Sequence, residues 1–156
     1  MRTTFRKAYA FGVLVLVLAA VGCKGTPPVY VSIEEELAAT ASVTVHIIGV
    51  QWVDHHVWSS KSVDEYWRPD DRLRAAATER DALHEMKFGP GHPSKQVLQP
   101  DAPIWKSWKE IEARYLFVIA DIPGVRGDRK LDFDLVKIRG KELQVRVSRK
   151  GLEHVK

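Results

Sequence analysis

The chain has 156 residues, a formal net charge of +4 at pH 7 and a sequence pI near 9.2, with 45% hydrophobic and 28% charged residues. This length predicts one domain with one hydrophobic core, and the composition excludes disorder, collagen-like repeats and a polytopic membrane protein. Residues 1–22 hold three of the basic residues and no acid. The remainder has 21 Lys and Arg against 20 Asp and Glu, a net charge of +1, so no nucleic-acid partner is expected.

The first 22 residues have the pattern of an export signal. Basic residues precede an apolar run, Ala8–Gly22, which at 15 residues is shorter than the roughly 20 needed to span a membrane. The segment Ala20–Cys23 resembles the bacterial lipobox, in which the cysteine is acylated after cleavage. Because Cys23 is the only cysteine, it has no disulfide partner in the chain, and lipidation explains its presence. The alternative is an ordinary signal peptide with an incidental cysteine.

Acylation of Cys23 would anchor the mature protein to a membrane, since several acyl chains together bind durably. The residue after the cysteine decides between the two bacterial membranes in the enteric lipoprotein-sorting rule, where aspartate retains the protein at the inner membrane. Here it is Lys24. By this resemblance we expect an outer-membrane lipoprotein that faces the periplasm.

A lipidated tether and a short helix are predicted over residues 23–41, between the anchor and the folded body. Glycine and two prolines in Lys24–Tyr30 favour an extended spacer. Ser32–Thr40 begins with a capping-box pattern, a serine followed three positions later by a glutamate, which predicts one or two helical turns. The alternation of β-branched and polar residues in Ser42–Val50 then predicts the first strand of a domain that spans 42–156.

The middle of the chain has weaker patterns. Gln51–Lys61 has no clean period and is predicted to be a loop or the distorted end of a hairpin, and Ser62–Arg68 is predicted to be a second strand. A proline at a helix start, followed by acids and by apolar residues near helical spacing, predicts a helix within Asp70–Lys87. Glycine and proline turns confine Ser94–Leu98 to a short strand.

The last third of the chain predicts three further strands. Arg114–Asp121 is almost entirely apolar, as expected of a strand buried on both faces and at the centre of the core. Leu131–Arg139 and Glu142–Arg149 alternate apolar and polar residues, and Gly140 and Lys141 between them predict a terminal hairpin. Short strands with one helical insertion predict a mainly β fold, an immunoglobulin-like or transthyretin-like β-sandwich.

The chemistry-bearing residues form no catalytic motif. Val118–Gly124 resembles the Asp-x-Pro-Gly switch of GTPases, but Gly89–Lys95 fails the spacing of a phosphate-binding loop. His55 and His56 are adjacent, so on a strand they would point to opposite faces rather than to one metal ion. No serine lies in a Gly-x-Ser-x-Gly elbow. We therefore expect no enzyme activity, no cofactor and no metal site.

Two features are candidates for binding. Gln51–Lys61 contains Trp52 and Trp58; exposed tryptophans are typical of interface centres, whereas buried ones belong to the core. Residues 126–156 hold ten Lys and Arg against five Asp and Glu, a net charge of +5. This excess fits an anionic partner such as peptidoglycan or lipid headgroups, and equally a solvated hairpin face.

The strand Arg114–Asp121 resembles part of the TssJ family, the outer-membrane lipoproteins of the bacterial type VI secretion system; the lipobox, the early strand and the closing hairpin agree with that order. The resemblance implies a transthyretin-like β-sandwich and a non-catalytic role, fastening the secretion system's membrane complex to the outer membrane. It also implies that the loop after the first strand contacts the periplasmic domain of TssM, an inner-membrane partner. Placed on Gln51–Lys61, this contact would use Trp52, Asp54, His55, His56 and Trp58.

The alternative function is a lipid-anchored envelope protein that binds a small ligand, a glycan or peptidoglycan through its basic face. A concave pocket with converging polar groups would favour this alternative, whereas an exposed aromatic loop would favour docking.

Overall fold

The structure, a computed structural model, describes residues 25–156. The predicted signal peptide and the predicted lipid anchor on Cys23 lie outside the described residues.

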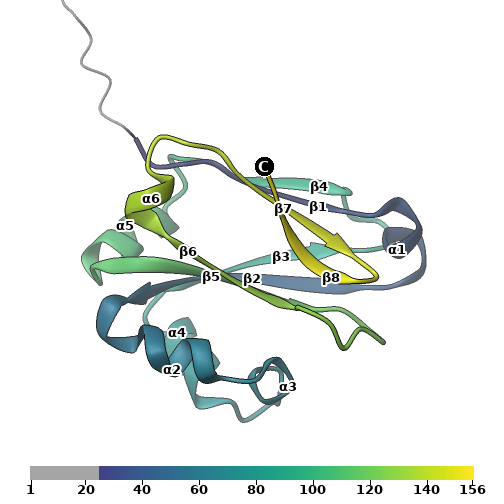
Figure 1. Ribbon diagram of the computed structural model, residues 1–156, viewed down its shortest axis with the longest axis horizontal. Coiled ribbons are helices and arrows are strands. Elements are labelled where there is room, and N and C mark those ends of the chain that lie inside the picture. Colours follow the sequence, from purple (N-terminus) through teal and green to yellow (C-terminus); the bar gives the residue numbers. More distant parts are fainter. Residues whose placement is uncertain (1–24) are drawn as a thin grey trace, which may run out of the picture.

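Eight strands form two four-stranded sheets that pack face to face (Figure 1). Sheet A has the order β4-β1-β7-β8, and sheet B has the order β3-β2-β5-β6. The strands of sheet A are β4 (Lys95–Leu98), β1 (Val29–Ile33), β7 (Leu143–Ser148) and β8 (Gly151–Val155). The strands of sheet B are β3 (Leu83–Phe88), β2 (Val43–Gln51), β5 (Ala113–Asp121) and β6 (Lys130–Asp134). Only β1 and β7 pair in parallel among these strands. The expected mainly β sandwich is confirmed.

The helices of the described chain are short and connect the strands. They are α1 (Glu35–Thr40), the 3-10 helix η1 (Trp52–Asp54), α2 (His55–Ser60), α3 (Val63–Tyr66), α4 (Arg72–Glu79), α5 (Ile104–Glu110) and α6 (Leu135–Ile138). Between β2 and β3, η1 to α4 form a helical layer, residues 52–79, on the side of sheet B that faces away from sheet A (Figure 1). No helix of the described chain combines the length and the apolarity needed to cross a bilayer.

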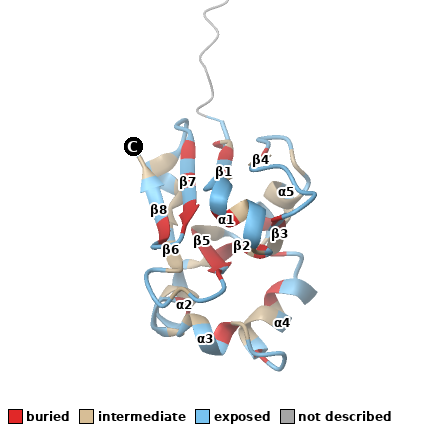
Figure 2. Ribbon diagram, turned by 90° about the vertical axis from the view of Figure 1, so that its right-hand side faces the viewer, coloured by how far each residue is buried: buried red, intermediate tan, exposed pale blue. Residues whose placement is uncertain are grey.

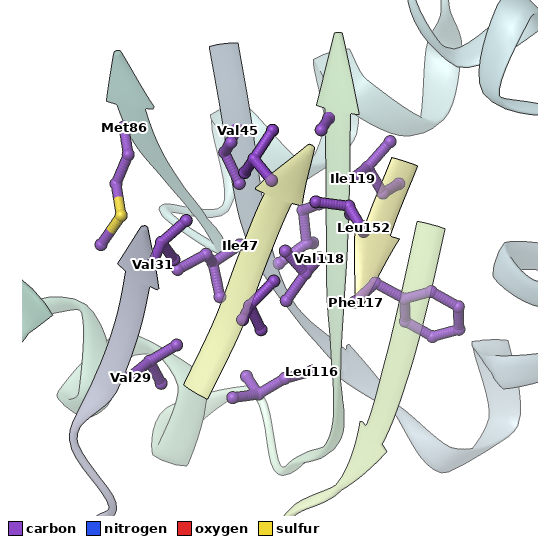
Figure 3. Close-up of a cluster of buried hydrophobic side chains, with 14 of the residues drawn as sticks. Val29, Val31, Val45, Ile47, Met86, Leu116, Phe117, Val118, Ile119 and Leu152 are labelled. Atoms are coloured by element: carbon purple, nitrogen blue, oxygen red, sulfur yellow. The ribbon is translucent and has the colours of Figure 1, made fainter. Parts of the chain in front are cut away.

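The core lies between the two sheets. Val29 and Val31 of β1 point toward Val45 and Ile47 of β2, and all four are fully buried (Figure 3). Sheet B is also covered on its other face, where Phe117 of β5 meets the helical layer with its ring 5.9 Å from that of Trp58. This second cover explains why the apolar run of β5 is continuous, as the sequence predicts for a strand buried on both faces.

Three predicted strands, Ser42–Val50, Ser94–Leu98 and Arg114–Asp121, are confirmed as β2, β4 and β5. The extended spacer predicted for Lys24–Tyr30 is shorter than expected, because Val29 and Tyr30 already belong to β1 (Val29–Ile33), a core strand that pairs with β4 and β7. The capping box predicted at Ser32 is also wrong, because Ser32 lies within β1 and the helix begins at Glu35 without a side-chain cap. Burial of every second side chain in β1 outweighed the local helix signal.

The middle of the chain differs most from the prediction. Gln51–Lys61 is not a loop, since η1 and α2 occupy it, and Ser62–Arg68 is not a strand, since Ser62 caps α3 by accepting a hydrogen bond from the amide of Glu65. The single helix predicted within Asp70–Lys87 is α4 followed by β3. The chain turns at Asp81, whose φ of 50° lies in the left-handed region.

The predicted terminal hairpin is also wrong. β6 belongs to sheet B and β7 to sheet A, and α6 carries the chain from one sheet to the other. The closing hairpin is instead β7 and β8, with Ser148 paired to Gly151 around the turn. Alternation of polar and apolar residues indicates one buried face per strand, but it does not indicate which sheet a strand joins.

Candidate docking surface

The helical layer is fastened to sheet B by buried aromatic rings and by a lysine. Trp58 and Tyr66 are 6% and 0% exposed and lie against each other and against the sheet. Lys130 of β6 donates from Nζ to the carbonyl oxygens of Trp58, Ser59 and Lys61, at 2.9, 2.7 and 2.7 Å. These carbonyl groups lie at the C-terminal end of α2, where no amide of the helix can donate to them. The ammonium group donates the hydrogen bonds that they would otherwise lack. Burial lowers the pKa of Lys130 from its ordinary value.

A histidine of sheet B anchors the next part of the layer. His46 is 5% exposed; its Nδ1 lies 2.7 Å from the Tyr66 hydroxyl and its Nε2 lies 3.3 Å from a carboxylate oxygen of Glu85. Burial lowers the pKa of His46 despite the opposing effect of Glu85. A neutral ring fits this geometry, with Nδ1 accepting from Tyr66 and Nε2–H donating to Glu85. The Trp67 ring covers His46 at 4.6 Å between centroids.

The start of α4 is fixed by a buried acid. One oxygen of Asp71 accepts from the amide of Arg74 at 2.8 Å, and the other lies 2.7 Å from the Lys61 ammonium group. The Asp71 side chain is 1% exposed, so its charge needs both partners. The layer is therefore a fixed part of the fold, although its four helices are only three to eight residues long.

The outer side of the layer exposes apolar side chains. Trp52, Val53 and Val57 are 70%, 70% and 50% exposed. Val57 also lines a cleft of about 200 Å³ between α2 and α4, with Trp58 and Ala77 among its other lining residues. We call these three residues and this cleft the docking surface. Exposed apolar side chains next to a cleft with an apolar floor can take up a side chain of a partner and exclude water from the contact.

The five residues predicted as partner contacts divide between this surface and the fold. Trp52 and His56 are exposed, and Asp54 lines the cleft. His55 stacks on Tyr115 at 4.0 Å and lies 2.9 Å from Asp132 through Nε2, so it fastens η1 and α2 to sheet B. Trp58 belongs to the core. The structure therefore does not bring the five together on one face.

Two members of the docking surface, Val53 and Val57, are not among the contacts predicted from the sequence. They lie four positions apart, which is one helical turn, but the segment was predicted as a loop and this spacing was not used. The prediction that Ser42–Val50 is the first strand is also wrong. It is the second strand, since β1 precedes it, so the connection after the first strand contains α1 and not Gln51–Lys61.

Several basic residues of 126–156 have partners in the fold. Arg129 pairs with Asp64 of α3, Arg146 with Glu153 at 3.1 Å, and Arg149 with Glu36 of α1 at 3.9 Å. Lys130 is used by the helical layer. Asp64 and Glu36 lie outside the segment and pair with two of its ten basic residues, whereas Glu153 is one of its own five acids, so most of the net charge of +5 remains. Within residues 25–156 there is no group of three or more His, Cys, Asp and Glu that could hold a metal ion.

Comparison with known proteins gives the class of fold. No family model matches the chain, and no curated protein matches it. One chain of a solved structure described as the TssM C-terminal domain of the type VI secretion system from EAEC aligns with a TM-score of 0.58 and 16% identity, over 83% of this chain and 100% of that chain.

A second solved structure aligns in the same way. It is Lip of Serratia marcescens, a membrane-bound component of the type VI secretion system, with a TM-score of 0.53 and 15% identity, over 83% of this chain and 95% of that one. At this identity the likeness defines the fold alone. The expected mainly β sandwich is therefore a fold that this chain shares with both structures.

Proposed function

We propose that the protein is a lipid-anchored, non-catalytic component of the bacterial envelope that fastens the membrane complex of a type VI secretion system to the outer membrane. The observation that carries this proposal is the fold, which aligns over 83% of the chain with two structures described as type VI secretion components. The lipobox at Ala20–Cys23 supplies the anchor, and Lys24 after it favours the outer membrane.

The partner in this proposal is the periplasmic domain of the inner-membrane component TssM, which the resemblance implies. The docking surface supports a protein partner rather than a small ligand, because its exposed side chains are apolar. Its cleft, about 200 Å³, is also smaller than a typical ligand pocket. Asp54 and Arg80 at the cleft add polar groups that would fix the orientation of the partner. Trp52 is the expected centre of the contact, since tryptophan buries a large area with little loss of side-chain freedom.

The anchor is tested by intact mass and membrane fractionation of the wild type beside Cys23→Ala. We expect the wild type to carry acyl mass and to fractionate with the outer membrane, and the variant to lose both. A soluble, unacylated wild type would refute the anchor.

Docking is tested by pull-down of the TssM periplasmic domain with the lipidated chain. Trp52→Ala and Val57→Asp should each weaken binding roughly tenfold or more, as expected for residues at the centre of a contact. Tyr30→Ala is the matched control, because Tyr30 is also an exposed aromatic residue, 40% exposed, but lies on sheet A. Thermal unfolding of each variant checks that the fold is intact. Equal binding by all three variants would refute the docking surface.

A further inference from the structure

A second hollow lies at the end of the sandwich where the described chain begins. It has a volume of about 370 Å³, and its lining comes from Gly25–Pro27, from α5, from the first two residues of β5, and from α6 with the residue after it. Figure 1 shows α5 and α6 together at this end, while α1 lies at the opposite end of the strands. The helical layer lies on the far side of sheet B from the point where the described chain begins, as Figures 1 and 2 both show. This hollow is therefore separate from the docking surface.

The lining of the hollow is apolar and basic. Trp105, Leu135 and Val136 provide apolar surface, and Val136 is 54% exposed. Lys109 and Arg139 are exposed and form no ion pair within the described residues, and no acidic side chain of residues 25–156 lines the hollow. Arg114 also lines it but is neutralised by Asp134 at 2.9 Å. Tryptophan and valine with free cations beside them suit the boundary between acyl chains and phosphate headgroups.

The covalent chain limits how far this hollow can lie from the anchor. Cys23 stands two residues before Gly25, and two residues span at most about 7 Å. A lipid on Cys23 that is inserted in a bilayer therefore holds Gly25, and the hollow that Gly25 lines, close to the headgroups. By contrast, α1 lies beyond the far end of β2, a strand of nine residues and thus about 30 Å long.

We propose that this hollow is a membrane-contacting surface, which binds the anionic phospholipid headgroups of the membrane that holds the Cys23 lipid. The inference rests on the proposed lipid anchor and goes beyond it, because it gives the folded body one orientation on the bilayer. Lys109 and Arg139 contact the phosphates, and Trp105 and Val136 lie at the level of the headgroups. The strands then point away from the bilayer, α1 is far from it, and the docking surface stays open to the periplasm at the side.

The test uses the lipidated mature chain in vesicles of phosphatidylethanolamine and phosphatidylglycerol. A fluorescent label is attached to Val136→Cys or, as the matched control, to Ala39→Cys, an exposed position on α1. Headgroup-labelled nitroxide lipids should quench the label at residue 136 several-fold more strongly than the label at residue 39. Reversal of the two cations, Lys109→Glu with Arg139→Glu, should remove this difference, whereas Lys95→Glu with Lys150→Glu at the far end should preserve it.

The outcomes separate this inference from the proposed function. Equal quenching at both positions in a chain that carries acyl mass would overturn the orientation while leaving the anchor and the docking surface standing. A label at residue 136 that is shielded from water but not quenched by the nitroxide lipids would also overturn it, because another occupant would then fill the hollow. A chain without acyl mass would overturn the anchor and, with it, this inference.

Discussion

Sheets A and B have the same number of strands but different surroundings. Sheet B lies between sheet A and the helical layer, and β5, one of its two central strands, has five consecutive buried residues, Leu116–Ala120. Sheet A has one covered face, so buried and exposed residues alternate along β7 (Figure 2). The outer face of sheet A carries side chains such as Tyr30, Gln144 and Arg146 around an open groove. The apolar side chains of the docking surface thus belong to the helical layer and not to either sheet of the sandwich.

The largest effect should come from the tryptophan that joins the layer to sheet B. Trp58→Ala removes a ring that is 94% covered, so we expect a loss of about 3–5 kcal/mol in the free energy of unfolding. Trp52→Ala, only six positions away but 70% exposed, should change it by no more than about 0.5 kcal/mol. Urea unfolding measures both. Similar losses for the two variants would contradict the division between core and docking residues.

A second, smaller effect should appear at Gly49 in β2. A β-carbon there would overlap the Trp108 indole, whose N–H donates to the carbonyl of Ala82 at 2.7 Å. The indole is held in place, so Gly49→Ala should cost about 1–3 kcal/mol of unfolding free energy through overpacking. Ser32→Ala, at the groove on the open face of sheet A, is the control and should unfold at nearly the wild-type urea concentration.

The pH dependence of stability should report the histidine under the layer. The pKa of His46 in the folded chain lies below its ordinary value of 6.5, so below that pH the unfolded chain binds the proton more readily than the folded one. The free energy of unfolding should therefore fall between pH 7 and pH 5, by at most about 1.4 kcal/mol per pH unit for this group. Protonated Nδ1 could no longer accept from Tyr66, which would loosen α3 from the sheet.

Urea unfolding of the wild type and His46→Gln at several pH values measures this contribution. The groups that face His46 are Tyr66, Glu85, Arg74 and, at longer range, Asp121. Burial also lowers the pKa of His84, so the His84→Gln variant controls for the second histidine. A His46→Gln variant with the full wild-type pH slope would show that His46 does not contribute.

The smallest effect is expected on the open face of sheet A. Arg146 pairs with Glu153 at 3.1 Å, but both side chains are about half exposed. Solvent screens such a pair, so Arg146→Ala should cost about 0.2–1 kcal/mol, and added salt should reduce the difference. A cost comparable to that of Trp58→Ala would mean that this face is as strongly packed as the covered face of sheet B.

Sequence patterns identified β2, β4 and β5 because each of these strands agrees with its own local signal. The same patterns gave the wrong structure for residues 51–68, where short helices are stabilised by contacts with residues distant in the sequence. Lys130 binds the end of α2 from 69 to 72 residues away, and His46 binds Tyr66 from 20 residues away. Isolated helices of four to six residues are unstable in water, so local signals such as the Ser62 cap of α3 and the spacing of Val53 and Val57 are too weak to form them without the tertiary contacts.

The sequence by itself determined a mainly β fold, because hydrophobic periodicity is a property of neighbouring residues, while the export signal and the anchor at Cys23 stay predictions from composition and a short motif. Only the tertiary structure decided that β1 lies between β4 and β7, that β6 and β7 join different sheets, and that Trp58 is buried while Trp52 is exposed. The physical reason is that burial depends on which distant element covers a side chain. Both tryptophans have polar neighbours in the sequence, and only Trp58 meets Phe117 of β5 in space.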